Sequence, residues 1–315
     1  GAGEMINGIP ESSKFDDVKI PEVGRQMEQT DQRPVPSLED LKNKLEVIFK
    51  VETLDDASTK ENITETNPLD ESNLCSVTLD DGTVVTVPDV KSYEIVTKAD
   101  DNGTVYLKNG ELEPNTTYEL NGNTYTTDEQ GRIIRCEARP ERSPENPRDV
   151  NAQIQAGGED RRPSDQGGHI VGRDLNGDGG AGNLVAMDSR INQSDYKRME
   201  NDIKAALDEG KDVTVTTDIS YSGDSNRPDT FTVVVTANGV KTVYKFDNNL
   251  DGGLKNEVSE NGKDAVQEEL NDTNGEISSI KEEYDENGEL TETTVNITYT
   301  DENGTNYRTK VYIDA

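Results

Sequence analysis

The chain has 315 residues and a net charge of −33, with 30% hydrophobic residues and no tryptophan. Its length allows two or three domains, but the low apolar content excludes one large core and favours several small β-rich units between solvated segments. No run of about 20 apolar residues occurs, so no membrane insertion is predicted.

The first 74 residues are predicted to form a flexible leader with one helix and an acidic linker. Gly1 to Met5 look like a remnant of expression cloning, so the natural N-terminus is expected to have been removed. From Ser37, apolar residues recur at helical spacing as far as Ile48. Residues 54–73 are acidic and rich in Thr and Asn, which indicates a linker.

Between residues 75 and 135 the apolar period changes to two, which is typical of strands. Three turn pairs separate the alternating runs: Asp81-Gly82, Asn109-Gly110 and Asn121-Gly122. Such pairs are the strongest short-range signal for a hairpin, so a small antiparallel β unit is predicted. Cys75 and Cys136 could form one disulfide in an exported protein or remain two free thiols, and the sequence allows both.

Residues 136–168 are rich in Pro, Arg, Gly and Asp, and we expect a long irregular loop. After it, residues 194–209 show one apolar helix face, which Gly210 ends. Alternating apolar residues then predict strands at 213–219, 231–236 and 240–246. The first domain after the leader is therefore placed at 75–250, with its core at about 118–246. Residues 251–315 are predicted to be a separate acidic C-terminal β-hairpin module.

The only histidine, His169, follows Gly167 and Gly168 and opens a short apolar run. The glycines allow close approach of backbone and ligand. An imidazole with its usual pKa near 6.5 is largely neutral at neutral pH and can accept a proton from water. A lone histidine is otherwise a surface or packing residue, so its context decides between the two interpretations.

That context is a series of ordered motifs between residues 118 and 228. They are Gly-Gly-His at 167–169, Asn-Leu-Val at 183–185, Asn192-Gln193 with Tyr196 and Met199-Glu200, and Tyr221-Ser222-Gly223 followed by Arg227-Pro228. With these motifs the segment resembles the DNA/RNA non-specific endonuclease family, in particular its branch of bacterial secreted and toxin proteins.

The resemblance implies an α+β fold with a ββα-metal core, in which a hairpin packs on a helix and a divalent cation lies between them. It implies that His169 is the general base and that Asn192 holds the metal, Mg²⁺ or Mn²⁺, whose remaining ligands are waters. Glu200 is implied near the hydrated metal and Asn183 in a supporting role. In-line attack on phosphorus would follow.

Arginines are the expected phosphate contacts, because their planar guanidinium forms paired hydrogen bonds with phosphate oxygens. The candidates are Arg161, Arg162, Arg173 and Arg227. Another branch of the family has an arginine two residues before the histidine, and here that position is Gly167. The role of that arginine must therefore be filled elsewhere or be missing.

The net charge opposes this interpretation, because nucleic acid is a polyanion. However, residues 131–205 hold 12 Lys and Arg against 13 Asp and Glu, whereas the other residues hold 20 against 52. The segment with the motifs is thus locally neutral. The alternative function is a non-catalytic acidic surface or binding module of a bacterial cell wall, or a degenerate nuclease.

Residues 174–179 resemble the start of a calcium loop, but position twelve, where an EF-hand needs glutamate, is Val185. A complete EF-hand is excluded, and a weak Ca²⁺ site or a simple turn remains. As a nuclease, the protein is expected to be secreted and to act on DNA and RNA. A toxin effector would also require an immunity or inhibitor protein as partner.

Overall fold

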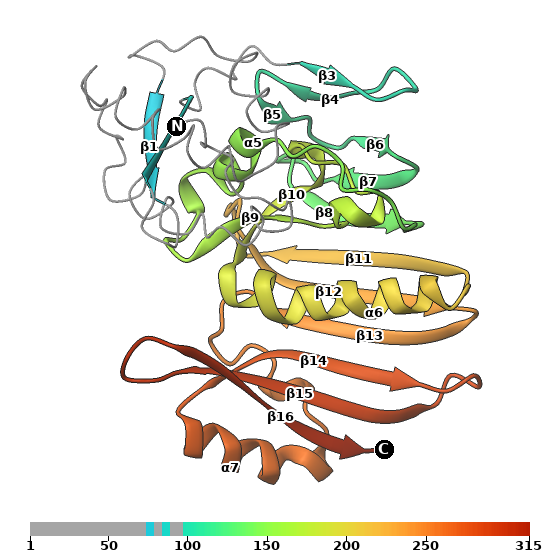
Figure 1. Cartoon of the computed structure of the whole chain (residues 1–315), viewed down its shortest axis with the longest axis vertical. Helices are drawn as coiled ribbons and strands as arrows, with labels where there is room; N and C mark the ends of the chain where they lie inside the picture. The colour runs from blue at the N-terminus through green and yellow to red at the C-terminus, as the bar shows by residue number, and fades with distance from the viewer. Residues whose placement is uncertain (1–73, 79–83, 89–96) are drawn as a thin grey trace.

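The computed structural model describes residues 74–78, 84–88 and 97–315, so the predicted leader, its helix and the acidic linker lie outside the described residues (Figure 1). Within the described residues, a nine-stranded antiparallel sheet runs through the whole molecule in the order β16-β15-β14-β13-β12-β11-β8-β7-β6. In chain order its strands are β6 (Thr117–Leu120), β7 (Asn123–Thr127), β8 (Ile133–Ala138), β11 (Val213–Tyr221), β12 (Pro228–Ala237), β13 (Val240–Asp247), β14 (Glu276–Tyr284), β15 (Leu290–Thr300) and β16 (Asn306–Asp314).

Three small sheets accompany it. They are β1 (Leu74–Thr78) with β2 (Val84–Pro88), β4 (Val105–Lys108) between β3 (Lys98–Ala99) and β5 (Glu111–Leu112), and β9 (Asp165–His169) with β10 (Leu184–Asp188). The helices of the described residues are α5 (Val150–Gln155), α6 (Tyr196–Asp208), α7 (Lys263–Thr273) and the π-helix η6 (Ile191–Asp195). Short 3₁₀ turns complete them: η3 (Gly158–Asp160), η4 (Arg173–Leu175), η5 (Ala181–Asn183), η7 (Lys255–Glu257) and η8 (Glu260–Gly262).

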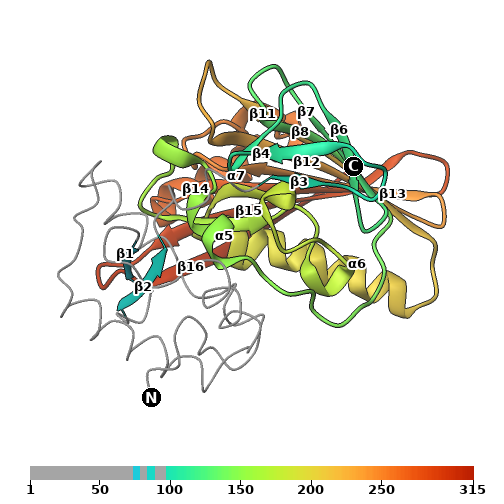
Figure 2. The ribbon, with the colours of Figure 1, turned by 90° about the horizontal axis from the view of Figure 1, so that it is seen from above.

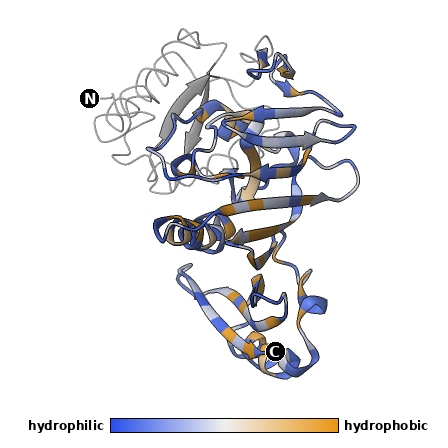
Figure 3. Ribbon diagram, turned by 90° about the vertical axis from the view of Figure 1, so that its right-hand side faces the viewer, coloured by the Kyte–Doolittle hydropathy of each residue, from blue (hydrophilic) through white to orange (hydrophobic). Residues whose placement is uncertain are grey.

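The described hairpins form where the turn pairs predict them. Asn121 and Gly122 adopt φ values of 53° and 82°, the left-handed conformation that a tight hairpin turn between β6 and β7 requires. Alternating side chains of the strands then reach opposite faces, and Figure 3 shows hydrophobic positions interspersed with hydrophilic ones along them. The prediction of antiparallel β-structure at 75–135 is confirmed, although its strands belong to three different sheets.

Among the described residues, two apolar cores stabilise the fold. In the larger core, α6 buries Tyr196, Met199 and Ile203 against β12 and β13, where Tyr196 contacts the rings of Phe231 and Phe246. Seen from above, α6 lies along one side of the sheet (Figure 2). The longest described helix is α6, at 13 residues, well short of the roughly 20 apolar residues of a bilayer crossing.

The C-terminal residues have a core of their own. Val266 and Leu270 of α7 pack against Ile280, Val295 and other apolar residues of β14–β16. The expected hairpin is β15–β16, with its turn at Asn303-Gly304. However, β14 pairs with β13, so this segment continues the large sheet, a connection that was not expected.

The prediction of an irregular loop over residues 136–168 was wrong. This segment contains the end of β8, the helix α5 and most of β9. The strand therefore ends at His169, whereas the sequence suggested an apolar run that begins there. Both glycines of β9 are closely covered: a Cβ atom at Gly167 would lie only 2.5 Å from the Cα atom of Gln153 on α5, and one at Gly168 would lie 2.9 Å from the Cβ atom of Met187 on β10.

Candidate active site

His169 lies at the junction of a hairpin and a helix. It is the last residue of β9 and pairs with Leu184, the first residue of β10. After β10 the chain passes through the π-helix η6 directly into α6. A π-turn is an uncommon feature that often occurs at functional sites. The order of strand, strand and helix is the one that the resemblance implied.

One face of this helical segment contacts the chain around His169. Asn192, Tyr196 and Glu200 recur every four residues, so they share a face. The Tyr196 hydroxyl donates to the Ile170 carbonyl at 2.6 Å. Two glycines near His169 lie close to this face. A Cβ atom placed on Gly168 would lie 3.2 Å from Asn192 Oδ1, and one placed on Gly172 would lie 2.5 Å from Glu200 Oε2.

Asn192 therefore lies close to Gly168 and Glu200 close to Gly172, the glycines that precede and follow His169 in the chain. One helical turn further on, Lys204 forms an ion pair with Asp174, which extends the same contact line. The predicted metal ligand, the predicted carboxylate and the predicted base are thus brought to one short stretch of chain. Because all three contacts depend on a helix docked by its buried apolar face, their spacing is fixed by the core.

The surroundings of His169 define which of its nitrogens is basic. The residue is 7% exposed, and its Nε2 atom lies 3.3 Å from the carbonyl oxygen of Gly179. A carbonyl oxygen only accepts hydrogen bonds, so this contact favours the proton on Nε2. In the neutral ring, Nδ1 then carries the lone pair and is the atom that can accept a proton.

Gly179 is itself held closely. A Cβ atom there would overlap the Pro147 carbonyl oxygen and lie 2.9 Å from the Cα atom of Arg148. The Gly179 carbonyl also accepts a hydrogen bond from the backbone N–H of Asp149 at 3.2 Å. Only glycine therefore fits this position, and the segment that precedes α5 fixes the oxygen that orients the histidine.

Asn183 is completely buried and acts through hydrogen bonds within the protein. Its Oδ1 atom accepts from the Tyr125 hydroxyl at 2.7 Å and from the Val171 N–H at 3.0 Å. Its Nδ2 atom donates to the carbonyls of Val171 at 2.8 Å and Asp178 at 2.7 Å. All four bonds of the amide are used, so Asn183 ties together the two ends of the loop between β9 and β10.

The β-rich lead-in supports that loop through a column of tyrosines. Tyr106, Tyr118 and Tyr125 are stacked with ring centroids 4.7 and 5.2 Å apart. The Tyr118 hydroxyl donates to the Gly182 carbonyl at 2.6 Å. Burial raises the pKa of Tyr118 well above its usual value, so the hydroxyl remains protonated and a donor at neutral pH.

The arginines proposed from the sequence lie in different environments. Arg162 is exposed, as a phosphate contact requires. Arg173 is buried and donates to the Asn146 carbonyl at 2.5 Å and to Glu145 Oε2 at 2.9 Å. Arg161 is also buried and donates to the last carbonyls of α5, at Gln153, Ile154 and Ala156.

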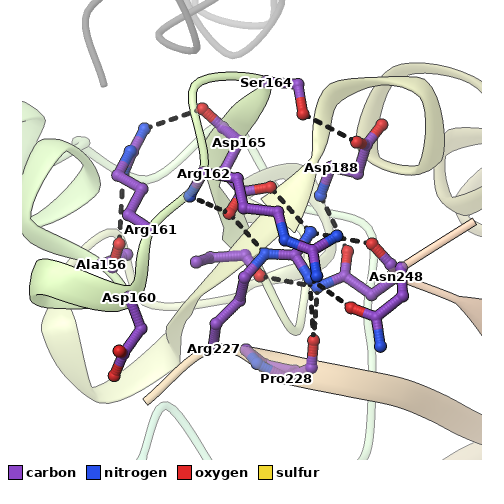
Figure 4. A network of polar contacts seen from close by, with 12 residues as sticks. Ala156, Asp160, Arg161, Arg162, Ser164, Asp165, Asp188, Arg227, Pro228 and Asn248 are labelled. Atoms are coloured by element: carbon purple, nitrogen blue, oxygen red, sulfur yellow. Dashed lines mark hydrogen bonds and ion pairs between the residues drawn. The ribbon is translucent and has the colours of Figure 1, made fainter. Parts of the chain in front are cut away.

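Arg227 is the centre of a buried polar network (Figure 4). Its Nε and Nη2 atoms donate to the two carboxylate oxygens of Asp165 at 2.7 and 2.9 Å. It also donates to Asn249 Oδ1 at 2.7 Å and to the Asn248 carbonyl at 2.8 Å. In this structure it anchors the first residue of β9 to the segment after β13, and it does not reach the surface.

The absence of an arginine at position 167 has a steric cause. The backbone of Gln153 on α5 occupies the space that any side chain at Gly167 would need. This helix, which the sequence did not indicate, therefore explains why position 167 is glycine here and arginine in another branch of the family.

The residues fit a cation that keeps most of its water. No group of three His, Cys, Asp or Glu side chains comes together anywhere in residues 97–315 to enclose a metal ion. However, the Asn192 amide is oriented by a hydrogen bond from its Nδ2 atom to Gln166 Oε1 at 2.7 Å. Its Oδ1 atom accepts no hydrogen bond from the described residues, so it can be a ligand. Mg²⁺ typically keeps several waters and takes few protein ligands.

The loop with calcium-like spacing directs many of its polar side chains to protein partners. Asp174 pairs with Lys204, and Asp178 Oδ2 accepts the backbone N–H of Gly180 at 2.9 Å. Asn176 donates its amide to Glu141 Oε1 at 3.0 Å. These interactions are those of a turn stabilised within the protein.

Several residues that contact the candidate site were not predicted from the sequence. Gln166 orients the Asn192 amide, Tyr196 fixes the backbone beside the histidine, and Gly179 supplies the carbonyl that orients the ring. Tyr196 was named within a motif but was given no role in the site. Its position midway between Asn192 and Glu200 on one helix face was the signal that could have identified it.

Comparisons with known proteins agree with this arrangement. Residues 114–239 match the family described as DNA/RNA non-specific endonuclease. The chain is also similar to the type VII secretion system protein EssD of Staphylococcus aureus strains USA300 and NCTC 8325, at 32% identity over 147 residues. This alignment covers 44% of the chain but only 24% of either relative.

Proposed function

We propose that this chain, which belongs through residues 114–239 to the DNA/RNA non-specific endonuclease family, is a metal-dependent endonuclease that hydrolyses DNA and RNA without sequence preference. The observation that carries the proposal is the position of His169. Its Nε2 atom faces a backbone carbonyl, while Asn192 and Glu200 lie close to the glycines that precede and follow it in the chain. Within this family, we interpret the hairpin β9–β10 and the helical segment η6–α6 as the ββα-metal core.

In the proposed reaction, His169 accepts a proton from water through Nδ1, and the water oxygen attacks phosphorus. The bond from phosphorus to the 3′ oxygen breaks, and solvent protonates the leaving oxygen. A divalent cation, Mg²⁺ or Mn²⁺, held by Asn192 with Glu200 close by, would supply charge neutralisation on the phosphate. Proton transfer to a positioned base contributes about 10²- to 10⁴-fold to such a rate.

Of the arginines predicted to contact phosphate, Arg162 is the one whose side chain lies at the surface. We assign it the contact with substrate. Arg173 and Arg227 are buried and would contact phosphate only after the segments that they anchor had moved. Asn183 is assigned a positioning role, because it fixes the loop that carries Gly179.

The similarity to a type VII secretion system protein supports secretion of this chain as a nuclease or toxin effector. A toxin of this kind requires a partner that neutralises it inside the producing cell. Expression in a bacterium is the test: induction of the wild type should stop growth, and induction of His169→Ala should not. Equal growth of both strains, at equal protein levels, would contradict the toxin assignment.

The cation assignment is tested by varying Mg²⁺ during cleavage of plasmid and of RNA. Asn192→Ala should raise the half-saturating Mg²⁺ concentration by at least tenfold, whereas EDTA should abolish cleavage by every variant. Asn201→Ala is the matched control, because this exposed asparagine lies on the same helix. Equal Mg²⁺ dependence of the two variants would overturn the role of Asn192. No cleavage by the wild type in any divalent cation would favour the non-catalytic acidic module.

A further inference from the structure

The basic residues of the acidic C-terminal segment gather on one face of its sheet. Residues 251–315 contain 5 Lys and Arg against 17 Asp and Glu. Three of the five, Lys281, Arg308 and Lys310, lie on β14 and β16. Their partners on the central strand β15 are Thr294, Thr298 and Asn296, respectively. Because Thr294, Asn296 and Thr298 alternate along one strand, they share a face, and so do the three cations.

The opposite face of these strands is apolar. Ile280, Val295, Ile297 and Ile313 lie there and form the core with α7. One face of this sheet therefore forms the apolar core of the segment, and the other face carries the basic residues. We call the second one the basic face and define it by Lys281, Arg308, Lys310 and Tyr312 of the sheet together with Arg198 of α6.

The basic face is fastened to the helical segment that carries Asn192. Arg308 Nη1 donates to Asp195 Oδ1 at 2.8 Å and to Ser194 Oγ at 3.2 Å. Ser278 Oγ donates to Asp195 Oδ2 at 2.5 Å. Asp195 is buried and is only three residues from Asn192. Strands far away in the sequence are thus held within one helical turn of the proposed metal ligand.

The inner cations of the basic face are paired with carboxylates, whereas the outer ones form no ion pair with a described residue. Lys281 pairs with Asp202 at 3.1 Å and with Glu283 at 3.9 Å, and Arg308 pairs with Asp195. Arg198 and Lys310 are exposed, and within the described residues neither forms an ion pair. The pKa of Lys310 is lowered, first by partial burial and then by the positive charges of Arg198, Arg308 and Lys281. These cations therefore repel each other, and a bound anion would relieve that repulsion.

An aromatic side chain completes the basic face. Tyr312 is opposite Thr294 on β15 and is 63% exposed, more than any other large hydrophobic residue among those described. Exposed aromatic rings beside cations are typical of proteins that bind single strands, because every base can stack on a ring. An acidic protein could also bind to the positive charges, but it has no bases that would stack on the ring of Tyr312.

We propose that the basic face binds the phosphate backbone of a nucleic acid strand beside the active site, so that residues 276–314 are part of the substrate-binding surface. This inference rests on the proposed function. Arg198 and Lys310 contact the phosphates, Tyr312 stacks on a base, and Arg308 is a positioning residue that holds the sheet against η6. Glu283, Glu292 and Asp314 lie at one end of the same face, so phosphate binding is confined to the part around Arg198 and Lys310.

The test uses His169→Ala as a background that binds without cleaving, with a fluorescein-labelled single-stranded DNA whose anisotropy reports binding. Arg198→Ala with Lys310→Ala removes the two outer cations. The salt slope is the change in the logarithm of the DNA affinity per tenfold change in salt concentration. Each lost phosphate contact makes this slope shallower by about 0.7 to 0.9, which corresponds to a loss of about five- to eightfold in affinity at 0.1 M relative to 1 M salt. The double variant should therefore bind about 25- to 60-fold more weakly, with a slope smaller by about 1.5.

The matched control is Lys255→Ala with Lys263→Ala, which also removes two positive charges but lies outside the basic face. It should leave affinity and slope unchanged. Equal effects of the two double variants would overturn the proposal, as would an absence of DNA binding by the parent. Tighter binding of polyglutamate than of DNA to the parent would overturn it in favour of an acidic protein partner. Plasmid cleavage by the wild type reports separately on the proposed function.

Discussion

The buried ion pair between Arg227 and Asp165 allows a quantitative test of how the site is held together. Arg227→Met removes two hydrogen bonds, of 2.7 and 2.9 Å, from a carboxylate whose side chain is 0% exposed. The Asp165 carboxylate would keep the hydrogen bond from the backbone N–H of Arg162 at 2.8 Å. Breaking a buried pair in this way typically costs about 3–5 kcal/mol of unfolding free energy, because one charge stays buried without its partner.

The structure also provides a control pair of the same length at the surface. Arg135 and Asp218 are 2.8 Å apart, with side chains 45% and 53% exposed. Solvent screens such a pair, so Arg135→Met should cost less than about 1 kcal/mol. Urea unfolding with linear extrapolation measures both free energies. A cost for Arg227→Met no larger than that for Arg135→Met would refute the reasoning and favour an exposed, phosphate-binding role for Arg227.

The same approach gives three further expectations. Gly167→Ala should lose about 1–3 kcal/mol in urea unfolding, because its Cβ atom would press on the backbone of Gln153; an unchanged stability would contradict this close contact. Burial raises the pKa of the Cys136 thiol to about 12, so in a Cys75→Ser background it should react with a thiol reagent at pH 8 only after urea is added; rapid reaction of the folded protein would contradict this. Tyr196→Phe should cost about 1–3 kcal/mol, since it leaves a buried carbonyl without its donor, and should also lower the cleavage rate; loss of stability with an unchanged rate would restrict Tyr196 to a structural role.

Local signals predicted much of the fold because they depend on nearby residues. The Asn121-Gly122 pair specifies its own turn through positive φ angles. The helical spacing of apolar residues in 194–209 directly predicts which face of α6 is buried. The π-helix that precedes α6 has no such signal, since Asp195 within it is bound by Ser278 and Arg308, which are distant in the sequence.

The helix α5 illustrates why the rest could not be predicted. It has six residues, of which only Val150 and Ile154 are buried apolar side chains, so its amphipathic period is too short to recognise. Its stability comes from the Asp149 N-cap and from Arg161, whose guanidinium binds the carbonyls at the other end. Arg161 was predicted to contact phosphate, and only the folded structure reveals that its guanidinium binds the end of α5.

The candidate site was predicted through resemblance. Its residues His169, Asn192 and Glu200 are separated by up to 31 positions in the sequence. The π-helix and α6 place Asn192 close to Gly168 and Glu200 close to Gly172. The carbonyl of Gly179 that orients the imidazole could not be anticipated, because any residue presents a carbonyl and only the loop conformation directs it.

The role of His169 as the base is tested most directly by chemical rescue. In Mg²⁺, His169→Gly should cleave plasmid about 10²- to 10⁴-fold more slowly than the wild type, and added imidazole should restore part of that rate. Imidazole should not accelerate the wild type. Cleavage by His169→Gly at the wild-type rate would show that another group removes the proton, and the proposed mechanism would be wrong.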